Sequence, residues 1–166
     1  MARPWKGVFA LTFDSAAGTR GARQPNGRVM RLMNSVMMRR LRRPGKGRVR
    51  DFDALILTTI GRKSGSERTT PVGWFPAGDG NWLVVASANG AADNPAWYYN
   101  LAANPDKARI EVRGETVPVT AEQLHGSERQ QAWEDIVKAA PSFAKYEDKT
   151  DRTIPIIKLT RQQSAV

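Results

Sequence analysis

Apolar residues at helical spacing mark the segment that begins at residue 28. They recur at intervals of three and four residues, as on one face of a helix, at Val29, Met30, Met33, Val36, Met37 and Leu41. Arginines lie mostly off this stripe, and the Pro44-Gly45 pair ends the pattern. The sequence therefore predicts a basic amphipathic helix within residues 28–46.

From residue 50 onward the pattern changes to short runs rich in β-branched and aromatic residues. Asp79-Gly80 and Gly114-Glu115 are the turn signals of two hairpins. Strands are predicted at residues 54–60, 68–75, 82–88, 108–114, 115–124 and 153–159. Several short strands joined by tight turns are typical of a small antiparallel barrel.

Two helices are predicted to interrupt the strands. Asn94 and Pro95 match an N-cap followed by proline at the first helical position, and this helix should stop before Pro105. Ser127 and Gln130 have the spacing of a capping box that opens a second helix. The packed face of that helix is expected to contain Ala132, Trp133, Ile136 and Val137. The chain is thus predicted to be α+β, with decorating helices around a barrel over residues 50–162.

The composition excludes several classes of site. None of the 166 residues is Cys, which excludes a disulfide framework, a thiolate metal site and a Cys nucleophile. One His argues against a zinc cluster and a Ser/His/Asp triad, and no metal site is expected. No apolar run approaches the roughly 20 residues that span a bilayer, and no signal peptide is recognisable. The expectation is a soluble, cytoplasmic protein.

Positive charge is concentrated at the N-terminus. Residues 1–50 contain 13 Lys/Arg and one acid, a net charge of +12, whereas the remaining 116 residues contain 13 Lys/Arg and 15 acids, a net of −2. Residues 1–27 show little periodicity and are predicted to be a flexible basic segment. Such a charge distribution suits an acidic partner: nucleic acid, anionic lipid or a polyanionic ligand.

A glycine-bounded turn gathers three further cations. Gly61 and Gly65 allow close backbone approach, and Arg62, Lys63 and Arg68 lie within or beside the turn. Exposed amide groups with adjacent cations suit a phosphate or carboxylates. A merely solvated, charged hairpin loop is the alternative interpretation.

The segment "VVASANGAADNPAWYYNL" is a second candidate. A strand that runs into small residues leaves room for a flat ligand beside the backbone; alternatively, this is a strand-to-helix loop and Trp97 belongs to the core. With no metal set, triad or thiol predicted, an enzyme of this build would take its chemistry from an organic cofactor.

These segments resemble the deazaflavin (coenzyme F420)-dependent nitroreductase/quinone reductase family. The resemblance covers roughly residues 50–160 and is carried, in order, by "LTTIGRKSGSERTTPVGWF", "WLVVASANGAADNPAWYYNLAANP" and "TDRTIPII". Members are split β-barrel proteins that use reduced F420. The resemblance implies hydride transfer from carbon 5 of the deazaflavin to a quinone, an enone or a nitroarene.

The resemblance also implies which residues form the site. The coenzyme's phosphate and oligoglutamate tail are expected at Arg62, Lys63, Ser64, Gly65 and Arg68, with Ser64 and Gly65 as backbone donors. The ring is expected along Pro71, Val72, Val85, Ala86 and Ser87, walled by Trp97. Asp151 and Arg152 are expected to order the C-terminal strand.

The substrate side of the site departs from the family pattern. Relatives that reduce nitroimidazoles have a Tyr-rich stretch before the "TDRTIPI" motif, where this chain has Ala140, Phe143 and Tyr146. One hydroxyl survives, which argues for a more apolar entrance and against efficient activation of nitro-prodrugs. Ser87, Tyr146 or solvent would supply the proton that follows the hydride.

Several alternatives stay open on the sequence alone. An FMN-binding oxidoreductase on the same barrel is one, although an FMN phosphate needs fewer cations than an oligoglutamate tail. A nucleic-acid-binding protein that uses the basic arm is another, and the sequence lacks the motifs that would favour it. The basic helix either packs on the barrel or lies on the inner face of an anionic membrane, near a lipid quinone. The oligomeric state is open.

Overall fold

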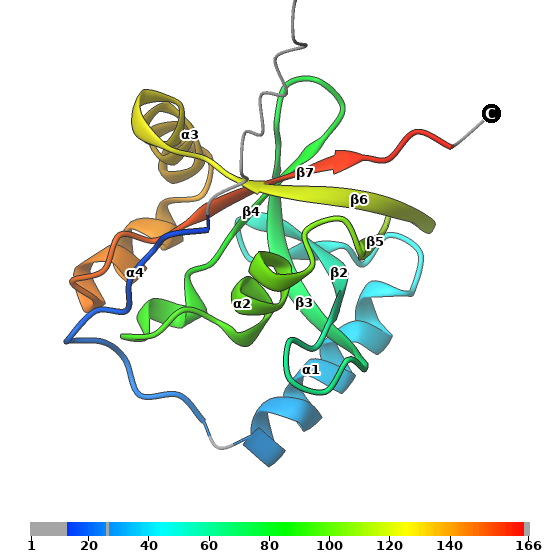
Figure 1. The fold of residues 1–166 in the computed structure, drawn as a ribbon, viewed down its shortest axis with the longest axis horizontal. Helices are drawn as coiled ribbons and strands as arrows, with labels where there is room; N and C mark the ends of the chain where they lie inside the picture. Colours follow the sequence, from blue (N-terminus) through cyan, green and yellow to red (C-terminus); the bar gives the residue numbers. More distant parts are fainter. Residues whose placement is uncertain (1–12, 26, 165–166) are drawn as a thin grey trace, which may run out of the picture.

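Six antiparallel strands close into a barrel in the computed structural model, which describes residues 13–25 and 27–164 (Figure 1). Around the barrel the order is β2-β3-β4-β7-β6-β5, and β2 also pairs with β5. A two-residue strand, β1, extends the sheet beside β2. The strands are β1 (Arg48–Val49), β2 (Phe52–Ile60), β3 (Glu67–Pro76), β4 (Trp82–Val85), β5 (Ala108–Val112), β6 (Glu115–Gln123) and β7 (Ile156–Arg161).

Alternation along the strands divides the apolar residues between two cores. On β5 the burial alternates residue by residue, so that Ala108, Ile110 and Val112 point into the barrel. The barrel interior contains, among others, Leu55, Leu57, Val84, Val119 and Leu159. A second core lies outside the barrel wall and includes Phe75, Val85, Trp133, Ile136, Phe143 and Ile156. The predicted α+β barrel is confirmed.

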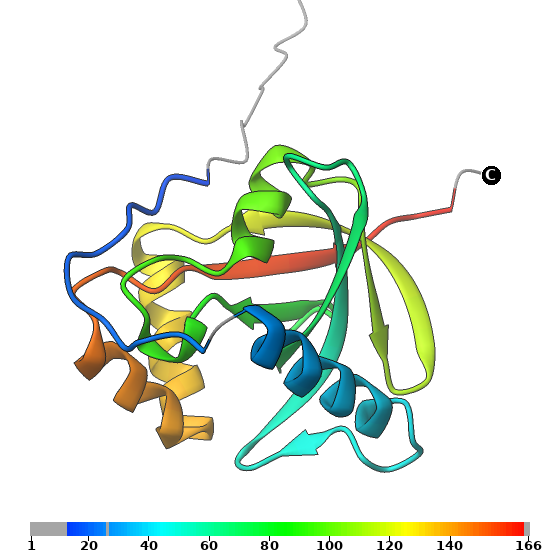
Figure 2. The same ribbon diagram turned by 90° about the horizontal axis from the view of Figure 1, so that it is seen from below.

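Among the described residues, four α-helices cover the barrel: α1 (Gly27–Leu41), α2 (Ala96–Ala103), α3 (Gly126–Ala139) and α4 (Ala144–Lys149). Two short 3-10 helices, η1 (Ala88–Gly90) and η2 (Pro141–Phe143), lie in the connections. Figures 1 and 2 show α1 running alongside β2 and β3, while α3 and α4 stand together on another side of the barrel. The packed face predicted for α3 is confirmed, with Trp133 and Ile136 buried and Ala132 and Val137 partly buried against them.

Both predicted helix caps were wrong. The helix expected after Asn94 begins at Ala96, with Pro95 as its N-cap. The Asn94 side chain instead donates to the backbone oxygen of Ser15 and accepts from the Arg152 guanidinium. The α3 helix has His125 as its N-cap, so Ser127 lies inside the first turn. A distant hydrogen-bond partner was available to Asn94, and tertiary partners can replace local capping.

The predicted stripe on α1 divides between two faces. Half-buried side chains face the barrel, at Met30, Asn34, Met37, Met38 and Leu41. The other apolar side chains point away and are between 45% and 68% exposed: Val29, Leu32, Met33 and Val36. The helix therefore packs on the barrel and still presents an apolar surface to its surroundings.

Residues 13–25, named the N-terminal strap below, run along the surface and lead to α1 (Figure 1). Asp151 accepts hydrogen bonds from the Thr19 hydroxyl, from the Thr19 amide at 2.8 Å and from the Arg20 amide at 3.0 Å. The flexibility predicted for residues 1–27 stays a prediction, and residues 1–12 and 26 lie outside the described residues. The strap itself is hydrogen-bonded to the rest of the fold.

Acid should release the Asp151 anchor. Hydrogen bonds, first from the Thr19 hydroxyl and then from the Arg20 amide, lower the pKa of Asp151 from 3.8 to about 2. A carboxylate whose pKa is depressed by folding contributes its full stability above the ordinary pKa and loses it as the pH falls through the lower value. The difference in unfolding free energy between the wild type and Asp151→Asn should therefore be constant above pH 3.8 and shrink as the pH falls toward 2. Urea unfolding over this pH range measures the difference, and a constant value throughout would contradict the assignment.

Candidate functional site

An apolar hollow of about 630 Å³ lies under α1, beside the middle of β3. Barrel residues form its floor, at Pro71, Val72, Val85 and Ser87, and Trp97 of α2 forms a wall. Met30, Asn34 and Met37 of α1 cover one side, and Phe143 and Tyr146 close another. The Phe143 and Tyr146 rings meet edge to face at 5.4 Å, so the second core supports this end of the hollow.

A cationic groove of about 600 Å³ adjoins the hollow. The Gly61–Arg68 turn contributes Arg62, Lys63, Ser64 and Arg68, and α1 contributes Arg31. Four residues line both the groove and the hollow: Asn34, Thr70, Ala96 and Trp97. The apolar hollow and the cationic groove are thus two parts of one elongated site.

The turn that carries these cations is held in shape by its own backbone. Gly61 donates to the Ser66 oxygen and Gly65 donates to the Gly61 oxygen, both at 2.8 Å. Gly65 has a φ of 69°, which favours glycine. A Cβ at Gly61 would lie 2.6 Å from the Ser64 hydroxyl oxygen, so a larger residue there would have to displace the Ser64 side chain.

Buried polar groups attach the turn to α2. The Asn100 side-chain oxygen accepts from the Arg62 amide at 3.1 Å, and its amide nitrogen donates to the Thr59 hydroxyl at 3.1 Å. The Arg62 guanidinium stacks 4.4 Å from the centre of the Tyr99 ring. Arg62 is therefore positioned by α2 before any ligand binds.

The three cations of the turn form no ion pair with any carboxylate among the described residues. Glu67 also lines the groove, but it is paired with Arg109, which keeps the pKa of the Glu67 carboxyl below its usual range. Positive charge in the groove thus stays available to an anionic ligand.

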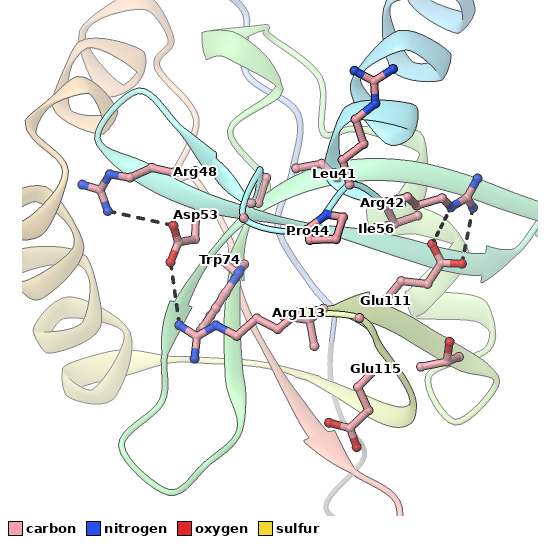
Figure 3. Close-up of a pocket in the computed structure, with 17 residues that line it drawn as sticks. Leu41, Arg42, Pro44, Arg48, Asp53, Ile56, Trp74, Glu111, Arg113 and Glu115 are labelled. Carbon is pink, nitrogen blue, oxygen red and sulfur yellow. Dashed lines mark hydrogen bonds and ion pairs between the residues drawn. The ribbon is translucent and has the colours of Figure 1, made fainter.

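Another cavity, of about 750 Å³ at the C-terminal end of α1, differs in this respect. Figure 3 shows Arg48 and Arg113 reaching Asp53 from two sides, each at 3.9 Å, and Arg42 facing Glu111 at 3.0 Å. Carboxylates inside that cavity neutralise much of its positive charge. The groove and hollow are the better candidate for a ligand that carries several negative charges.

Most of the predicted site residues come together here, but three do not line the site. Ala86 is fully buried and its amide donates to the Pro155 oxygen, so it stabilises the strand without lining the hollow. Ala140 is fully buried in the second core, at the end of α3. Gly65 lies at the exposed tip of the turn with its amide already bonded to Gly61, so the predicted role as a free backbone donor does not fit this geometry.

Sequence reasoning missed the contribution of α1. The helix provides Met30, Asn34 and Met37 to the hollow and Arg31 to the groove. Asn34 was the available signal for this contribution, because it is a polar residue between two methionines of the stripe. It lies on the half-buried face of α1. Gln24 of the strap also lines the hollow, and nothing in its surrounding sequence indicated this.

The Ser87–Asn94 loop forms the end of the hollow and is held by a buried arginine. The Arg152 guanidinium, in a residue 5% exposed, donates to the backbone oxygens of Ser87 (2.7 Å) and Ala91 (2.8 Å) and to the Asn94 side chain (2.9 Å). Burial lowers the pKa of this group. Arg152 thus orders this loop. It also lies just before β7, the C-terminal strand that it was expected to order.

Comparison with known proteins decides the family. A model of the family described as F420H(2)-dependent quinone reductase matches residues 29–161. The chain belongs to this family. F420H(2)-dependent quinone reductase Rv1261c of Mycobacterium tuberculosis is 37% identical over 112 residues, which cover 66% of this chain and 74% of the relative.

Solved structures agree with this assignment. A structure of an F420-H2-dependent reductase (FDR-A) has 36% identity and a TM-score of 0.58, over 64% of this chain and 93% of that one. A structure described as a domain-swapped dimer has 31% identity and a TM-score of 0.60, over 82% of this chain and 100% of that one. The first match places the barrel described above with the barrel of an F420-H2-dependent reductase.

The chain is an oxidoreductase that depends on reduced coenzyme F420, as the resemblance predicted. Its cationic groove and apolar hollow fit the two halves of such a coenzyme, which joins an acidic tail to a flat ring. Within residues 13–25 and 27–164, no helix has the length and hydrophobicity needed to cross a membrane.

Replacing Asn100 by Leu should destabilise the fold and loosen the turn. The change leaves the Arg62 amide and the nearly inaccessible Thr59 hydroxyl without their partner, and an unsatisfied buried group costs about 1–3 kcal/mol. Thr59→Val in the Asn100→Leu background should recover part of the loss, because it removes one of the two stranded groups. Urea unfolding of the two single variants and the double variant measures this coupling; strictly additive losses would contradict it.

Proposed function

We propose that the chain binds F420 with its deazaflavin ring in the apolar hollow and its phosphate and oligoglutamate tail along the cationic groove. The observation that carries this proposal is the direct junction of the two cavities at Asn34, Thr70, Ala96 and Trp97. The unpaired charges of Arg62, Lys63 and Arg68 favour a ligand with several carboxylates over one with a single phosphate.

The dimensions of the hollow support this placement. Sites for small molecules usually have volumes of about 300–1,000 Å³, and the hollow has about 630 Å³. Its small or flat lining residues, such as Pro71 and Ser87, leave space beside the backbone for a planar ring. Trp97, 6% exposed, packs into the barrel core and offers a fixed wall.

Bound reduced F420 supplies a hydride from carbon 5 to the acceptor. The residues of the chain hold the two reactants face to face, and orientation of this kind can lower a barrier by several kcal/mol. Met30 and Met37 on one side and Phe143 on another exclude water from the ring. Ser87 and Tyr146 bring hydroxyl groups to the hollow, and either one can hold or deliver the proton that the reduced acceptor takes up.

A quinone is the acceptor that we favour over an enone or a nitroarene. Of the three residues predicted for the substrate pocket, Phe143 and Tyr146 line the hollow and Ala140 does not, which leaves a mainly apolar entrance with one hydroxyl. Met30 and Met37 add further apolar and adaptable surface from α1. Such a lining suits a hydrophobic ring better than a polar nitroheterocycle.

Removal of either free cation should weaken binding of F420. In titrations that follow the coenzyme's own fluorescence, Lys63→Ala and Arg68→Ala should each raise the Kd about tenfold at low salt, because a charge-assisted hydrogen bond contributes about 1.5–3 kcal/mol before screening. Lys138→Ala on α3 is the matched control and should bind like the wild type. FMN, titrated in parallel, should bind more weakly than F420.

Three outcomes would contradict the proposal. Equal binding by the wild type and both groove variants would mean that the tail lies elsewhere. Preference for FMN would move the chain to an FMN-dependent mode on the same barrel. Nucleic acid that displaced F420 with a steep salt dependence would revive the alternative role of the basic N-terminal arm.

We also propose that the exposed face of α1 contacts an anionic membrane from the cytoplasmic side, where a lipid quinone is the acceptor. Val29, Leu32, Met33 and Val36 form a continuous apolar stripe at i, i+3, i+4 and i+7 on this face, and each is at least 45% exposed. Exposed arginines lie on the same helix and just beyond it, at Arg28, Arg39, Arg40 and Arg43. The opposite face of α1 covers the hollow, so a lipid acceptor would enter beside it.

Charged substitutions on this face should abolish membrane binding and leave the site intact. Leu32→Glu combined with Val36→Glu should remove the chain from sedimenting vesicles that contain anionic lipid, while F420 binding and reduction of a water-soluble quinone stay unchanged. Ala102→Glu on α2, also an exposed helical position, is the control. Equal sedimentation of all variants, or none by the wild type, would refute membrane contact without affecting the proposal for F420.

A further inference from the structure

The N-terminal strap, residues 13–25, lies outside the part of the chain that the family model matches and yet touches the candidate site. The match begins at residue 29. Gln24, near the end of the strap, lines the apolar hollow and donates a hydrogen bond to the Ala88 oxygen. A segment beyond the family match therefore contributes directly to the wall on which the coenzyme ring is placed.

Two backbone hydrogen bonds join the strap to the Ser87–Asn94 loop. Gly18 donates to the Ala92 oxygen at 2.7 Å, and Ala22 donates to the Gly90 oxygen at 2.8 Å. At the other end of the loop, the Asn94 side chain donates to the Ser15 oxygen at 3.0 Å. These contacts give the loop a partner on its outer side.

The fit between strap and loop depends on a glycine. A Cβ at Gly21 would lie 2.0 Å from the Ala92 nitrogen and 2.4 Å from the Ala91 carbonyl carbon, so any side chain there would push the strap away from the loop. The left-handed region of φ is not involved, because no positive φ occurs at Gly21. Close approach alone explains the glycine.

The loop is poorly suited to hold its shape without help. Ala88 and Asn89 have φ values of 45° and 55°, a conformation that costs free energy for residues other than glycine. The surrounding structure has to determine such a conformation. Arg152 holds the loop from the inner side through Ser87, Ala91 and Asn94, and the strap holds it from the outer side.

We propose that the N-terminal strap is a positioning element of the F420 site: together with Arg152 it clamps the Ser87–Asn94 loop in the conformation that faces the coenzyme ring. The proposal rests on the placement of the ring proposed above. Asp151 fixes the strap through Thr19 and Arg20, and the Arg20 guanidinium adds a bond to the Asp148 oxygen at 2.9 Å. The neighbouring residues Asp151 and Arg152 thus act on the two sides of one loop.

Displacement of the strap in the full-length chain tests the proposal. Gly21→Ala should lift the strap, and Asp151→Ala should release its anchor, so each should raise the Kd for F420 about five- to tenfold, the effect of losing one or two net hydrogen bonds. Hydrogen exchange without coenzyme should be faster at the Gly18 and Ala22 amides. Gly27→Ala is the matched control, since a Cβ there meets nothing within 4 Å.

The outcomes separate this proposal from the proposed function. If the wild type binds F420 and both strap variants bind it like Gly27→Ala, the strap has no positioning role, even if their melting temperatures fall. If the variants lose affinity while Lys138→Ala and Gly27→Ala do not, the role is established. A wild type that does not bind F420 at all would reject the placement of the ring, and a normal exchange rate at Gly18 and Ala22 in Gly21→Ala would reject the clamp independently.

Discussion

The pairing of β2 with β3 is the constraint on which the site depends. The register pairs Thr59 with Arg68 and Leu55 with Val72, so the cationic and apolar ends of the site follow one another along β3. Four residues separate Arg68 from Val72, which corresponds to about 13 Å of strand at about 3.3 Å per residue. A slip of one residue would turn every side chain of β3 to the other face. Because β2 also pairs with β5, closure of the barrel fixes this register.

Charge pairing distinguishes the candidate site from the cavity at the C-terminal end of α1. The chain has a net charge of +10, and the arginines that line that cavity include Arg42, Arg48 and Arg113, which meet carboxylates. Arg62, Lys63 and Arg68 meet none among the described residues. A local excess of charge attracts anions more effectively than a high total, because salt screens charges beyond about 10 Å.

Much of the site could be predicted because its residues lie close together in the sequence. The Gly61–Arg68 turn, the strand residues Pro71 and Val72 and the wall at Trp97 occur in contiguous motifs, and the structure brings them to adjoining cavities. The helix cap predicted at Asn94 was wrong because this side chain has partners at Ser15 and Arg152, far away in sequence. The side of α1 that faces the barrel could not be chosen from periodicity, because apolar residues occupy both faces. The strap lacked any periodic signal. Its contacts depend on Gly21, where the absence of a side chain allows the two backbones to approach closely.

The strap shows how a segment outside the matched region can act on the barrel. The barrel strands fall within the region that the family model matches, and so does the Gly61–Arg68 turn. The strap precedes that region and approaches the Ser87–Asn94 loop from outside, while Arg152, inside the region, approaches the loop from within. A loop with two non-glycine residues at positive φ retains a single shape only if its neighbours on both sides fit closely. Residues that precede the matched region can therefore adjust the proposed ring pocket without altering the turn proposed to hold the acidic tail.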